Sequence, residues 1–578
     1  MAHRKRPRSR DGKAAAKAGA AKRRKSDRPI LSDADIAKAA ARASTSLTSS
    51  LREDSRLFAD DLVDEAIDEA EELGLMLDGD EDEDENNVSE DDAYFLKAPR
   101  QGPPHPRGRP AADIVAEPAR AGARAGAAPP PLDARHLFPR NLKLDYPVAV
   151  RAKGIWIEDS SGRRYLDGCG GAVVCSIGHG VPEIADIMSA QAERLAFAHS
   201  SQFISREAAG LAARIAALAP GDMKKSGRVY LVSGGSEAVE TAIKLARQYQ
   251  IESGRPGKSK IISRWQSYHG STMGALSVTG NVARRELYMP MFTAMPHIEP
   301  CYCYRCPFGL KYPSCDIACI EELESTIRQE GPDSVAAFIA EPIVGATLGA
   351  VPAVDGYWKR AREICTQHDI LLIADEVMTG IGRTGKNFAV DHHRVVPDLI
   401  VTGKGLSAGY APLGAVIARD AVTKALERGR GYFEHGFTYS ANPLSAAIGT
   451  AVLDYIREHR LVSRAARVGR VLGRKLKAAM RRHAIVGDVR GAGMMWGVEL
   501  VRDRKSREPF PPQLKVARKL YEACFAEGLL IYPGAGTRQG QDGDHFIIAP
   551  PFTVTLPEID ELLARLDRGL KAVRRKLV

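Results

Sequence analysis

Between residues 207 and 420 the chain alternates short apolar runs with segments of helical periodicity, and this alternation limits the folds open to it. The runs are rich in Val, Ile and Leu along their whole length, which is typical of strands buried on both faces. Such strands occur in α/β proteins, where helices cover both faces of a mostly parallel sheet. The runs expected to form this sheet are 229–232, 260–262, 336–340, 370–374, 399–401 and 415–417.

One lysine, Lys404, lies where a sheet of this kind binds its ligands. It follows the apolar run 399–401 and is flanked by Gly403 and Gly405, which permit a tight turn. Ligands of open α/β sheets bind beyond the carboxyl ends of the strands. A lysine at this place either keeps its ammonium group in water or forms an imine with an aldehyde cofactor and acts as a covalent catalyst.

Gly235 and Ser236 begin a helix directly after the run 229–232. The free N–H groups and the dipole of a helix N-terminus attract anions, and the Ser236 hydroxyl adds another donor. We therefore expect a phosphate site here, although a serine at this position is also an ordinary way to start a helix.

Asp375 ends the run 370–374 and should lie at the same sheet edge as Lys404. A buried carboxylate requires a cationic partner, because burying it unpaired costs several kcal/mol. A protonated pyridine nitrogen of a cofactor is one such partner. A structural pair with Arg383 is the alternative.

Tyr268 follows the run 260–262 in the segment Ser-Tyr-His-Gly, and Val377 stands two positions after Asp375. An aromatic ring at this edge can stack on a flat heteroaromatic ring, while Val377 closes the other face of that ring. The alternative for Tyr268 is an ordinary core tyrosine.

Taken together, these features resemble the class III aminotransferases, which are fold-type I enzymes that use pyridoxal 5′-phosphate. The resemblance extends from Tyr146 to the C-terminus. It rests on the spacing of Asp375 and Lys404, on the Gly-Ser helix start and on Tyr-His-Gly between them. It is strengthened by three further segments, YLDGCGGAVVCSIGHG (165–180), GIGRTG (380–385) and APPFTVT (549–555).

The resemblance implies a role for each site residue. Lys404 forms the imine with the cofactor, Asp375 pairs with the pyridine nitrogen, and Thr438 in HGFTYSANP (435–443) reaches the phosphate bound by a neighbouring subunit. The active unit implied is a homodimer. The remaining residues expected to bind the cofactor are Gly235 and Ser236 at the phosphate, Tyr268 and Val377 at the ring, and His269.

The function expected from this resemblance is transfer of an amino group from an ω-amino acid or related amine, such as 4-aminobutyrate or β-alanine, to a 2-oxo acid. The kinetics are expected to be ping-pong. The same scaffold also hosts racemases, decarboxylases and phospho-lyases, because the cofactor stabilises any carbanion formed next to it. A protein of another class, tethered to nucleic acid by a basic arm, is a further alternative.

Two positions depart from the pattern of the family. Ala346 stands where enzymes that use 4-aminobutyrate with 2-oxoglutarate commonly have a glutamate, which favours pyruvate as the acceptor. Met378 replaces a frequent glutamine near the phenolic oxygen of the cofactor. An arginine for the substrate carboxylate is still required, and Arg538 and Arg383 are the candidates.

Five cysteines lie close together in the chain. Thiols at such spacing can ligate zinc or an iron–sulfur cluster, but the spacing is not that of a zinc ribbon and the family needs no metal. We therefore expect reduced thiols, or an occasional disulfide in this loop, and no metal. The five are Cys301, Cys303, Cys306, Cys315 and Cys319.

The charge of the chain is concentrated before residue 134. Residues 1–28 hold twelve Lys and Arg against two Asp, whereas residues 53–92 hold twenty Asp and Glu against one Arg. Such blocks repel internally, so 1–134 is expected to be a disordered extension, with a helix between 56 and 77 at most, and specific nucleic-acid binding is not expected.

The rest of the chain is divided by its pattern. Residues 135–206 are expected to start a smaller α+β domain, 207–444 to form the large cofactor-binding domain, and 445–578 to complete the smaller one. Short antiparallel strands are expected at 149–150, 154–157 and 164–167, and further strands of the smaller domain at 497–500 and 546–548. The absence of a long apolar run and of a secretory signal, together with nine cysteines, favours a soluble cytoplasmic protein without a membrane partner.

Overall fold

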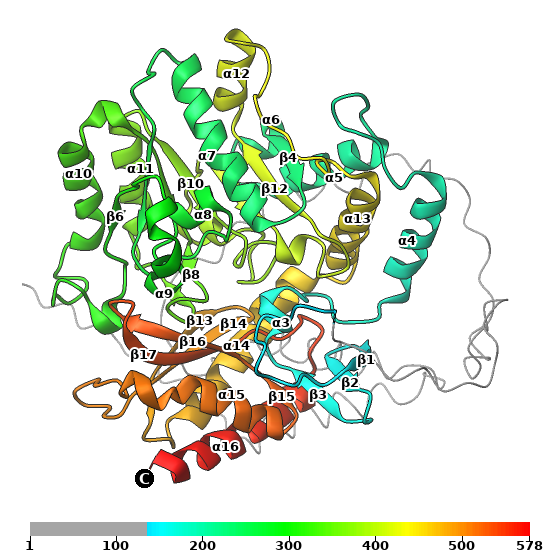
Figure 1. Ribbon diagram of the computed structural model, residues 1–578, viewed down its shortest axis with the longest axis vertical. Helices are drawn as coiled ribbons and strands as arrows, with labels where there is room; N and C mark the ends of the chain where they lie inside the picture. The colour runs from blue at the N-terminus through cyan, green and yellow to red at the C-terminus, as the bar shows by residue number, and fades with distance from the viewer. Residues whose placement is uncertain (1–135, 578) are drawn as a thin grey trace, which may run out of the picture. The chain divides into compact units, whose positions relative to one another are not determined.

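The computed structural model describes residues 136–577. The predicted N-terminal extension and the helix expected between 56 and 77 lie outside the described residues. Three larger sheets and the helices around them make up the described part (Figure 1).

The central sheet has seven strands, in the order β4-β12-β11-β10-β7-β5-β6. Neighbouring strands run parallel except at β12, which is antiparallel to both β11 and β4. The prediction of a mostly parallel sheet is therefore confirmed. The strands span β4 Arg228–Val232, β5 Lys260–Arg264, β6 His297–Ile298, β7 Val335–Ala340, β10 Leu371–Asp375, β11 Leu399–Thr402 and β12 Gly414–Ala418.

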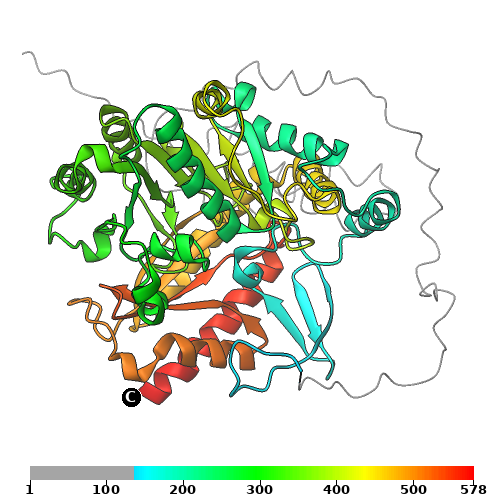
Figure 2. The ribbon, with the colours of Figure 1, turned by 45° about the horizontal axis from the view of Figure 1, so that its top comes forward.

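Helices cover both faces of this sheet, as alternate residues of β10 demonstrate (Figure 2). Leu371 and Ile373 pack in one core with Val239 of helix α7, whereas Leu372 lies in the other core with Trp358 of helix α11. A strand buried on both faces needs apolar residues throughout, which explains its continuous LLIA sequence. The helices that follow or flank the sheet strands are α5 Arg206–Leu218, α6 Met223–Ser226, α7 Gly235–Glu252, α8 Met273–Ser277, α9 Val282–Arg285, α10 Ala318–Glu330, α11 Tyr357–Gln367, α12 Asp420–Arg428 and α13 Pro443–Glu458.

A second sheet, β13-β14-β17-β16, forms near the C-terminus and is antiparallel throughout. The runs at 497–500 and 546–548, expected to be strands, lie in β14 and β17, but β13 and β16 were not predicted. Their sequences, VGDVRGA and YPGAGTR, contain the glycine and proline that usually indicate turns. The elements here are β13 Val486–Ala492, β14 Met495–Leu500, β16 Tyr532–Arg538, β17 Asp542–Ile548, α14 Leu461–Met480, α15 Val516–Ala526 and α16 Leu556–Leu577.

The third sheet joins the two ends of the described chain. Its order is β1-β2-β3-β15, and Leu529 of β15 pairs in parallel with Leu166 of β3. In Figure 1 the cyan strands accordingly lie beside the orange and red C-terminal helices. Short strands near 149, 154–157 and 164–167 were predicted and are confirmed. The elements are β1 Ala149–Lys153, β2 Trp156–Asp159, β3 Arg164–Asp167, α3 Gly170–Val173, α4 Pro182–Arg194 and β15 Leu529–Leu530, with a small hairpin of β8 Ile343–Val344 and β9 Val351–Pro352.

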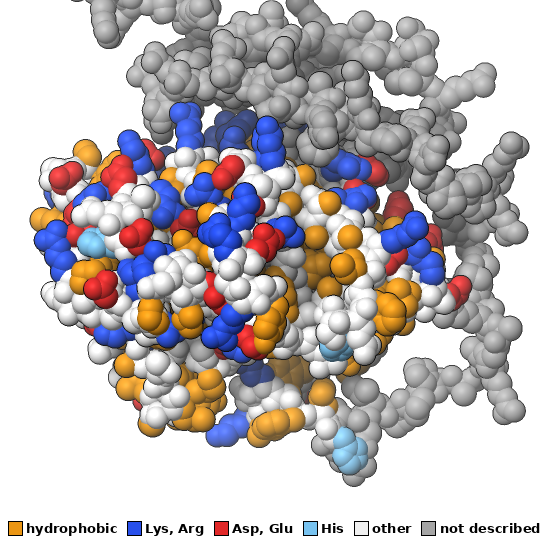
Figure 3. Space-filling model, turned by 90° about the horizontal axis from the view of Figure 1, so that it is seen from above, with side chains coloured by type: hydrophobic (Ala, Val, Ile, Leu, Met, Phe, Trp, Pro, Cys, Tyr) orange, Lys and Arg blue, Asp and Glu red, His pale blue; other side chains and the backbone are white. Residues whose placement is uncertain are grey.

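This pairing brings part of 135–206 together with part of 445–578, although the domain boundaries at 206 and 444 stay predictions. Within 136–577, the structure contains no helix long and apolar enough to cross a membrane. On the face shown in Figure 3, blue Lys and Arg side chains are mixed with red Asp and Glu wherever grey atoms do not cover them.

Candidate active site

Three loops that carry predicted site residues leave the same edge of the central sheet. Asp375 is the last residue of β10 and pairs in register with Val401 of β11. Lys404 begins the short 3-10 helix Lys404–Leu406 just beyond β11, and Gly235 begins α7 just beyond β4. The expectation that Asp375 and Lys404 share this edge is thereby confirmed.

Lys404 is held in an uncommon backbone conformation. Its φ of 44° lies in the left-handed region, where a residue other than glycine is strained. Strain of this kind persists where the surrounding structure enforces it, often at functional sites. A Cβ added to Gly403, the residue before Lys404, would lie 3.5 Å from the backbone nitrogen of Gly235. The lysine loop therefore packs directly against the start of α7.

The Lys404 side chain is half-buried, and its surroundings lower the pKa of its amine. Burial lowers its pKa to about 8; nearby Asp375 acts in the opposite direction, while Arg284 and Arg383 lower the pKa further. Within the described part of the chain, no carboxylate lies within ion-pair distance of its ammonium group. Near pH 8 half of the Lys404 amines are neutral, which is the form that attacks an aldehyde.

Asp375 is buried, with 3% of its surface exposed, and it pairs with a histidine. Its Oδ2 lies 2.6 Å from Nδ1 of His269, and its Oδ1 accepts a hydrogen bond of 3.1 Å from the Val377 backbone. The alternative of a pair with Arg383 is wrong, because the Arg383 guanidinium donates to backbone carbonyls, including that of Pro550 at 2.7 Å. The contacts of Asp375 fix its carboxylate at the sheet edge.

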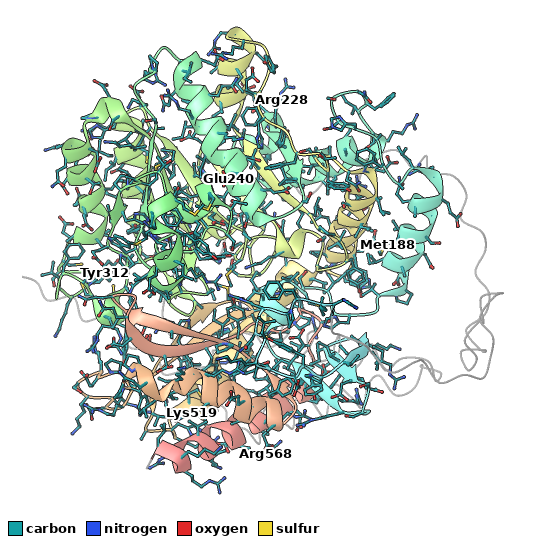
Figure 4. The ribbon with its side chains drawn as sticks, in the orientation of Figure 1. Met188, Arg228, Glu240, Tyr312, Lys519 and Arg568 are labelled. Carbon is teal, nitrogen blue, oxygen red and sulfur yellow. The ribbon has the colours of Figure 1, made fainter. Side chains whose placement is uncertain are left out.

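The first turn of α7 meets the loops that follow β5 and β10. The Ser236 Oγ accepts a hydrogen bond of 3.0 Å from the Ser271 backbone. A Cβ added to Gly235 would lie 2.9 Å from Cγ1 of Val377, so only glycine leaves room there. Further along α7, Glu240 accepts a hydrogen bond from the Ala275 backbone and ties α8 to this helix (Figure 4).

Tyr268 is half-buried and fixed at both ends. Its backbone N–H donates to Oε1 of Glu341 at 3.1 Å, and its hydroxyl lies 2.8 Å from the Ser271 hydroxyl. Glu341 also pairs with Arg264 at 3.2 Å. Sequence reasoning did not identify Glu341 as a support for Tyr268; its position directly after strand β7 was the available signal.

Seven of the eight predicted residues thus lie at one edge of the sheet, linked by direct contacts or through Ser271 and Gly403: Gly235, Ser236, Tyr268, His269, Asp375, Val377 and Lys404. Thr438 is not among them. It is exposed and lines a separate surface hollow with Tyr230, His435 and Phe437. Among residues 136–577 of one chain, no hydrogen bond or ion pair joins Thr438 to the residues around Lys404.

The five clustered cysteines are free thiols. Cys303, Cys306, Cys315 and Cys319 line one small cavity beside Tyr302. Among residues 136–577, no three His, Cys, Asp or Glu side chains are arranged so that they hold a metal ion.

The groups at the sheet edge fit one cofactor. An amine of lowered pKa can condense with an aldehyde, and a buried carboxylate can pair with a pyridine nitrogen. A helix N-terminus can bind a phosphate ester. A mostly parallel sheet with these groups at its carboxyl edge defines a transferase of fold type I that depends on pyridoxal phosphate.

Comparison with known proteins specifies the class further. Residues 140–570 match the family described as "Aminotransferase class-III", and the chain belongs to this family of pyridoxal-phosphate-dependent aminotransferases. It is 40% identical over 442 residues to the uncharacterized aminotransferase YodT of Bacillus subtilis, covering 76% of this chain and 99% of YodT.

Two further relatives carry more specific descriptions. The chain is 39% identical to the diaminobutyrate–2-oxoglutarate transaminase of Halomonas elongata, over 74% of this chain and 90% of that protein. A solved amine transaminase from an uncultivated Pseudomonas species, with pyridoxal phosphate bound, superposes with a TM-score of 0.71 at 34% identity, covering 76% of this chain and 99% of that one.

The contact between Gly235 and Val377 provides a test of the phosphate end of the site. Gly235→Ala is expected to weaken pyridoxal phosphate binding about tenfold, because forcing a methyl group into a filled space costs about 1–3 kcal/mol. Titration of the cofactor-free protein with pyridoxal phosphate measures this change. Gly234→Ala is the matched control: a Cβ there has no atom within 4 Å, and its φ of 175° suits any residue. Equal losses in both variants would contradict the prediction.

Proposed function

We propose that this protein transfers an amino group from an ω-amino acid or related amine, such as 4-aminobutyrate or β-alanine, to a 2-oxo acid by a ping-pong mechanism. The observation that carries the proposal is the juxtaposition of Lys404, with its lowered pKa, and the buried Asp375 at the sheet edge. A relative described as acting on diaminobutyrate, which carries an amino group at its far end, supports the choice of donor.

In this proposal two residues handle the reacting groups. Pyridoxal phosphate, when bound, supplies an aldehyde that condenses with amines and a ring that takes up electrons from the neighbouring carbon. With the cofactor bound, Lys404 would hold it covalently, and the Lys404 amine, when free, would accept the proton released from the substrate carbon. Asp375 keeps the ring nitrogen protonated, which strengthens the pull on electrons.

The other residues position the cofactor. Gly235 and Ser236 would bind its phosphate and Tyr268 and Val377 would contact its ring, while His269 orients the Asp375 carboxylate through the bond of 2.6 Å. An anion at the first turn of an α-helix is stabilised by the free N–H groups there.

Thr438 is assigned to a second subunit's site. It is exposed and separate from the Lys404 cluster, as expected for a residue that reaches the phosphate held by a partner. The active unit in this proposal is a homodimer.

The acceptor proposed is pyruvate. The Ala346 methyl group offers no charge for the second carboxylate of 2-oxoglutarate, and Met378 packs against an apolar cluster that includes Ile343. The Halomonas relative is described with 2-oxoglutarate, so the two acceptors have to be compared directly.

The visible absorbance of the purified protein tests the proposal. Cofactor bound to Lys404 absorbs near ~420 nm. This band is expected to disappear when 4-aminobutyrate or β-alanine is added without any keto acid, and to return with pyruvate faster than with 2-oxoglutarate. A band that no amine removes would refute transamination and favour the racemase, decarboxylase or phospho-lyase chemistry of the same scaffold.

A further inference from the structure

The substrate carboxylate requires a cation near Lys404, and the two arginines expected to supply it are already engaged. Arg538 forms an ion pair with Asp542, through an Nε–Oδ1 contact of 2.7 Å, and a second one with Glu508 at 3.4 Å. The buried Arg383 donates to the carbonyl oxygens of Pro550 and Met494. Neither guanidinium is available for a new anion unless it gives up these partners.

A third arginine near the site is also neutralised. Arg264, the last residue of β5, is buried and lies 3.2 Å from the Glu341 carboxylate. Because Glu341 also holds the Tyr268 backbone, this pair supports the cofactor loop and carries no free charge.

Arg284 differs from these three. It stands on α9, and its guanidinium carbon lies 4.3 Å from the centre of the Tyr268 ring. The side chain is half-buried, so it is held in place and still reachable. Among residues 136–577, no Asp or Glu lies within ion-pair distance of it.

The charge of Arg284 also affects the pKa of the Lys404 amine. Arg284 and Arg383 are the two arginines that lower the pKa of Lys404, and the donors of Arg383 already bind carbonyl oxygens. Among residues 136–577, the guanidinium of Arg284 therefore has no hydrogen-bond or ion-pair partner, and its donors can bind a ligand.

We propose that Arg284 binds the carboxylate of the amino-acid and oxo-acid substrates. A guanidinium presents a fixed pair of N–H donors that match the two oxygens of a carboxylate. The guanidinium carbon lies over the Tyr268 ring, 4.3 Å from its centre, and this cation–π contact holds the group beside the site. This assignment rests on the proposed function, since it names the residue that distinguishes an ω-amino acid from a simple amine.

The cofactor phosphate is the other anion that an arginine at this place can bind. The first turn of α7 and the Ser236 hydroxyl already provide donors for a phosphate, which favours the substrate carboxylate as the ligand of Arg284. The two sources of the anion separate experimentally, because only the phosphate contributes to cofactor affinity.

The test compares donors that differ in one carboxylate. For the holoenzyme, Arg284→Gln is expected to lower kcat/KM for 4-aminobutyrate by about 10- to 100-fold, mainly through KM, and to change the value for butylamine by less than about threefold. Arg284→Lys should recover part of the loss. Arg538→Gln, which removes the rival arginine, should leave the preference for 4-aminobutyrate over butylamine unchanged.

A second measurement needs no turnover. Butanoate carries the carboxylate but no amine, and calorimetry of its binding to the holoenzyme should give a Kd about 10- to 100-fold higher for Arg284→Gln than for the wild type. Equal butanoate affinity in both proteins would overturn the inference, and so would an equal loss of kcat/KM for 4-aminobutyrate and butylamine. A tenfold fall in the affinity of the variant for pyridoxal phosphate would also overturn it. A wild type that binds butanoate through Arg284 but accepts neither 4-aminobutyrate nor β-alanine would instead refute the proposed function alone.

Discussion

Replacing Lys404 with alanine is expected to lower the rate of transamination by more than about 10⁴-fold. The change removes both the covalent link to the cofactor and the base that moves the proton, and base catalysis alone contributes about 10²–10⁴-fold. The rate is measured with 4-aminobutyrate and pyruvate. Covalent attachment is measured independently by borohydride reduction and mass spectrometry, which should find the cofactor on residue 404 of the wild type only.

The control for this variant is Lys424→Ala. Lys424 is exposed on α12 and pairs with Asp420 one helical turn away, so its loss should leave activity and cofactor attachment unchanged. A Lys404→Ala protein that keeps activity within tenfold of the wild type, or a cofactor reduced onto another lysine, would show that the assignment of Lys404 is wrong.

Asp375→Asn is expected to lower kcat by about 10²- to 10³-fold, the loss seen when one preorganised charge is removed from a reaction centre. The amide has the shape of the carboxylate but no charge, so the ring nitrogen of the cofactor loses the partner that keeps it protonated. Single-turnover loss of the cofactor band with 4-aminobutyrate measures this step apart from product release.

The same substitution is expected to shift a pH profile. Nearby Asp375 raises the pKa of Lys404 against the larger effect of burial, which lowers it to about 8. Without that carboxylate the pKa of Lys404 falls further, and the neutral, reactive amine is present at lower pH. The rate at which the cofactor-free protein captures pyridoxal phosphate should therefore reach half its maximum below pH 8 in the variant.

Asp544→Asn serves as the matched control. Asp544 is also a buried strand aspartate, but it lies on β17, where it accepts a hydrogen bond of 2.8 Å from the Ala517 backbone. Its replacement should affect stability and leave the pH profile of cofactor capture in place. An unshifted profile in Asp375→Asn would contradict the coupling between Asp375 and Lys404.

Most of the sheet edge was predictable because strands buried on both faces consist of continuous runs of apolar residues. The run before Asp375 and the run before Lys404 form β10 and β11, and parallel strands bring their carboxyl ends together. Strand β16 was not predictable in this way, since YPGAGTR combines a proline with two glycines and is held by its pairing with β17.

The partners of charged side chains were harder to predict than the positions of those side chains. Asp375 was correctly placed, yet its partner is His269 and not Arg383, because pairing depends on where loops from distant strands meet. Arg538 appeared free in the sequence but is paired with Asp542. The sequence contains no marker that separates an engaged arginine from one such as Arg284, whose guanidinium has no ion-pair partner within residues 136–577.

The parallel pairing of Leu166 with Leu529 has a consequence for synthesis of the chain. The two residues are about 360 positions apart, and a ribosome adding about 5–20 residues per second needs roughly 20 to 70 seconds between them. Throughout that interval the outer edge of β3 has no strand to pair with. The nascent protein therefore carries an open strand edge until translation is nearly finished. During this period the edge can pair with other chains, and a chaperone that covers it would prevent aggregation.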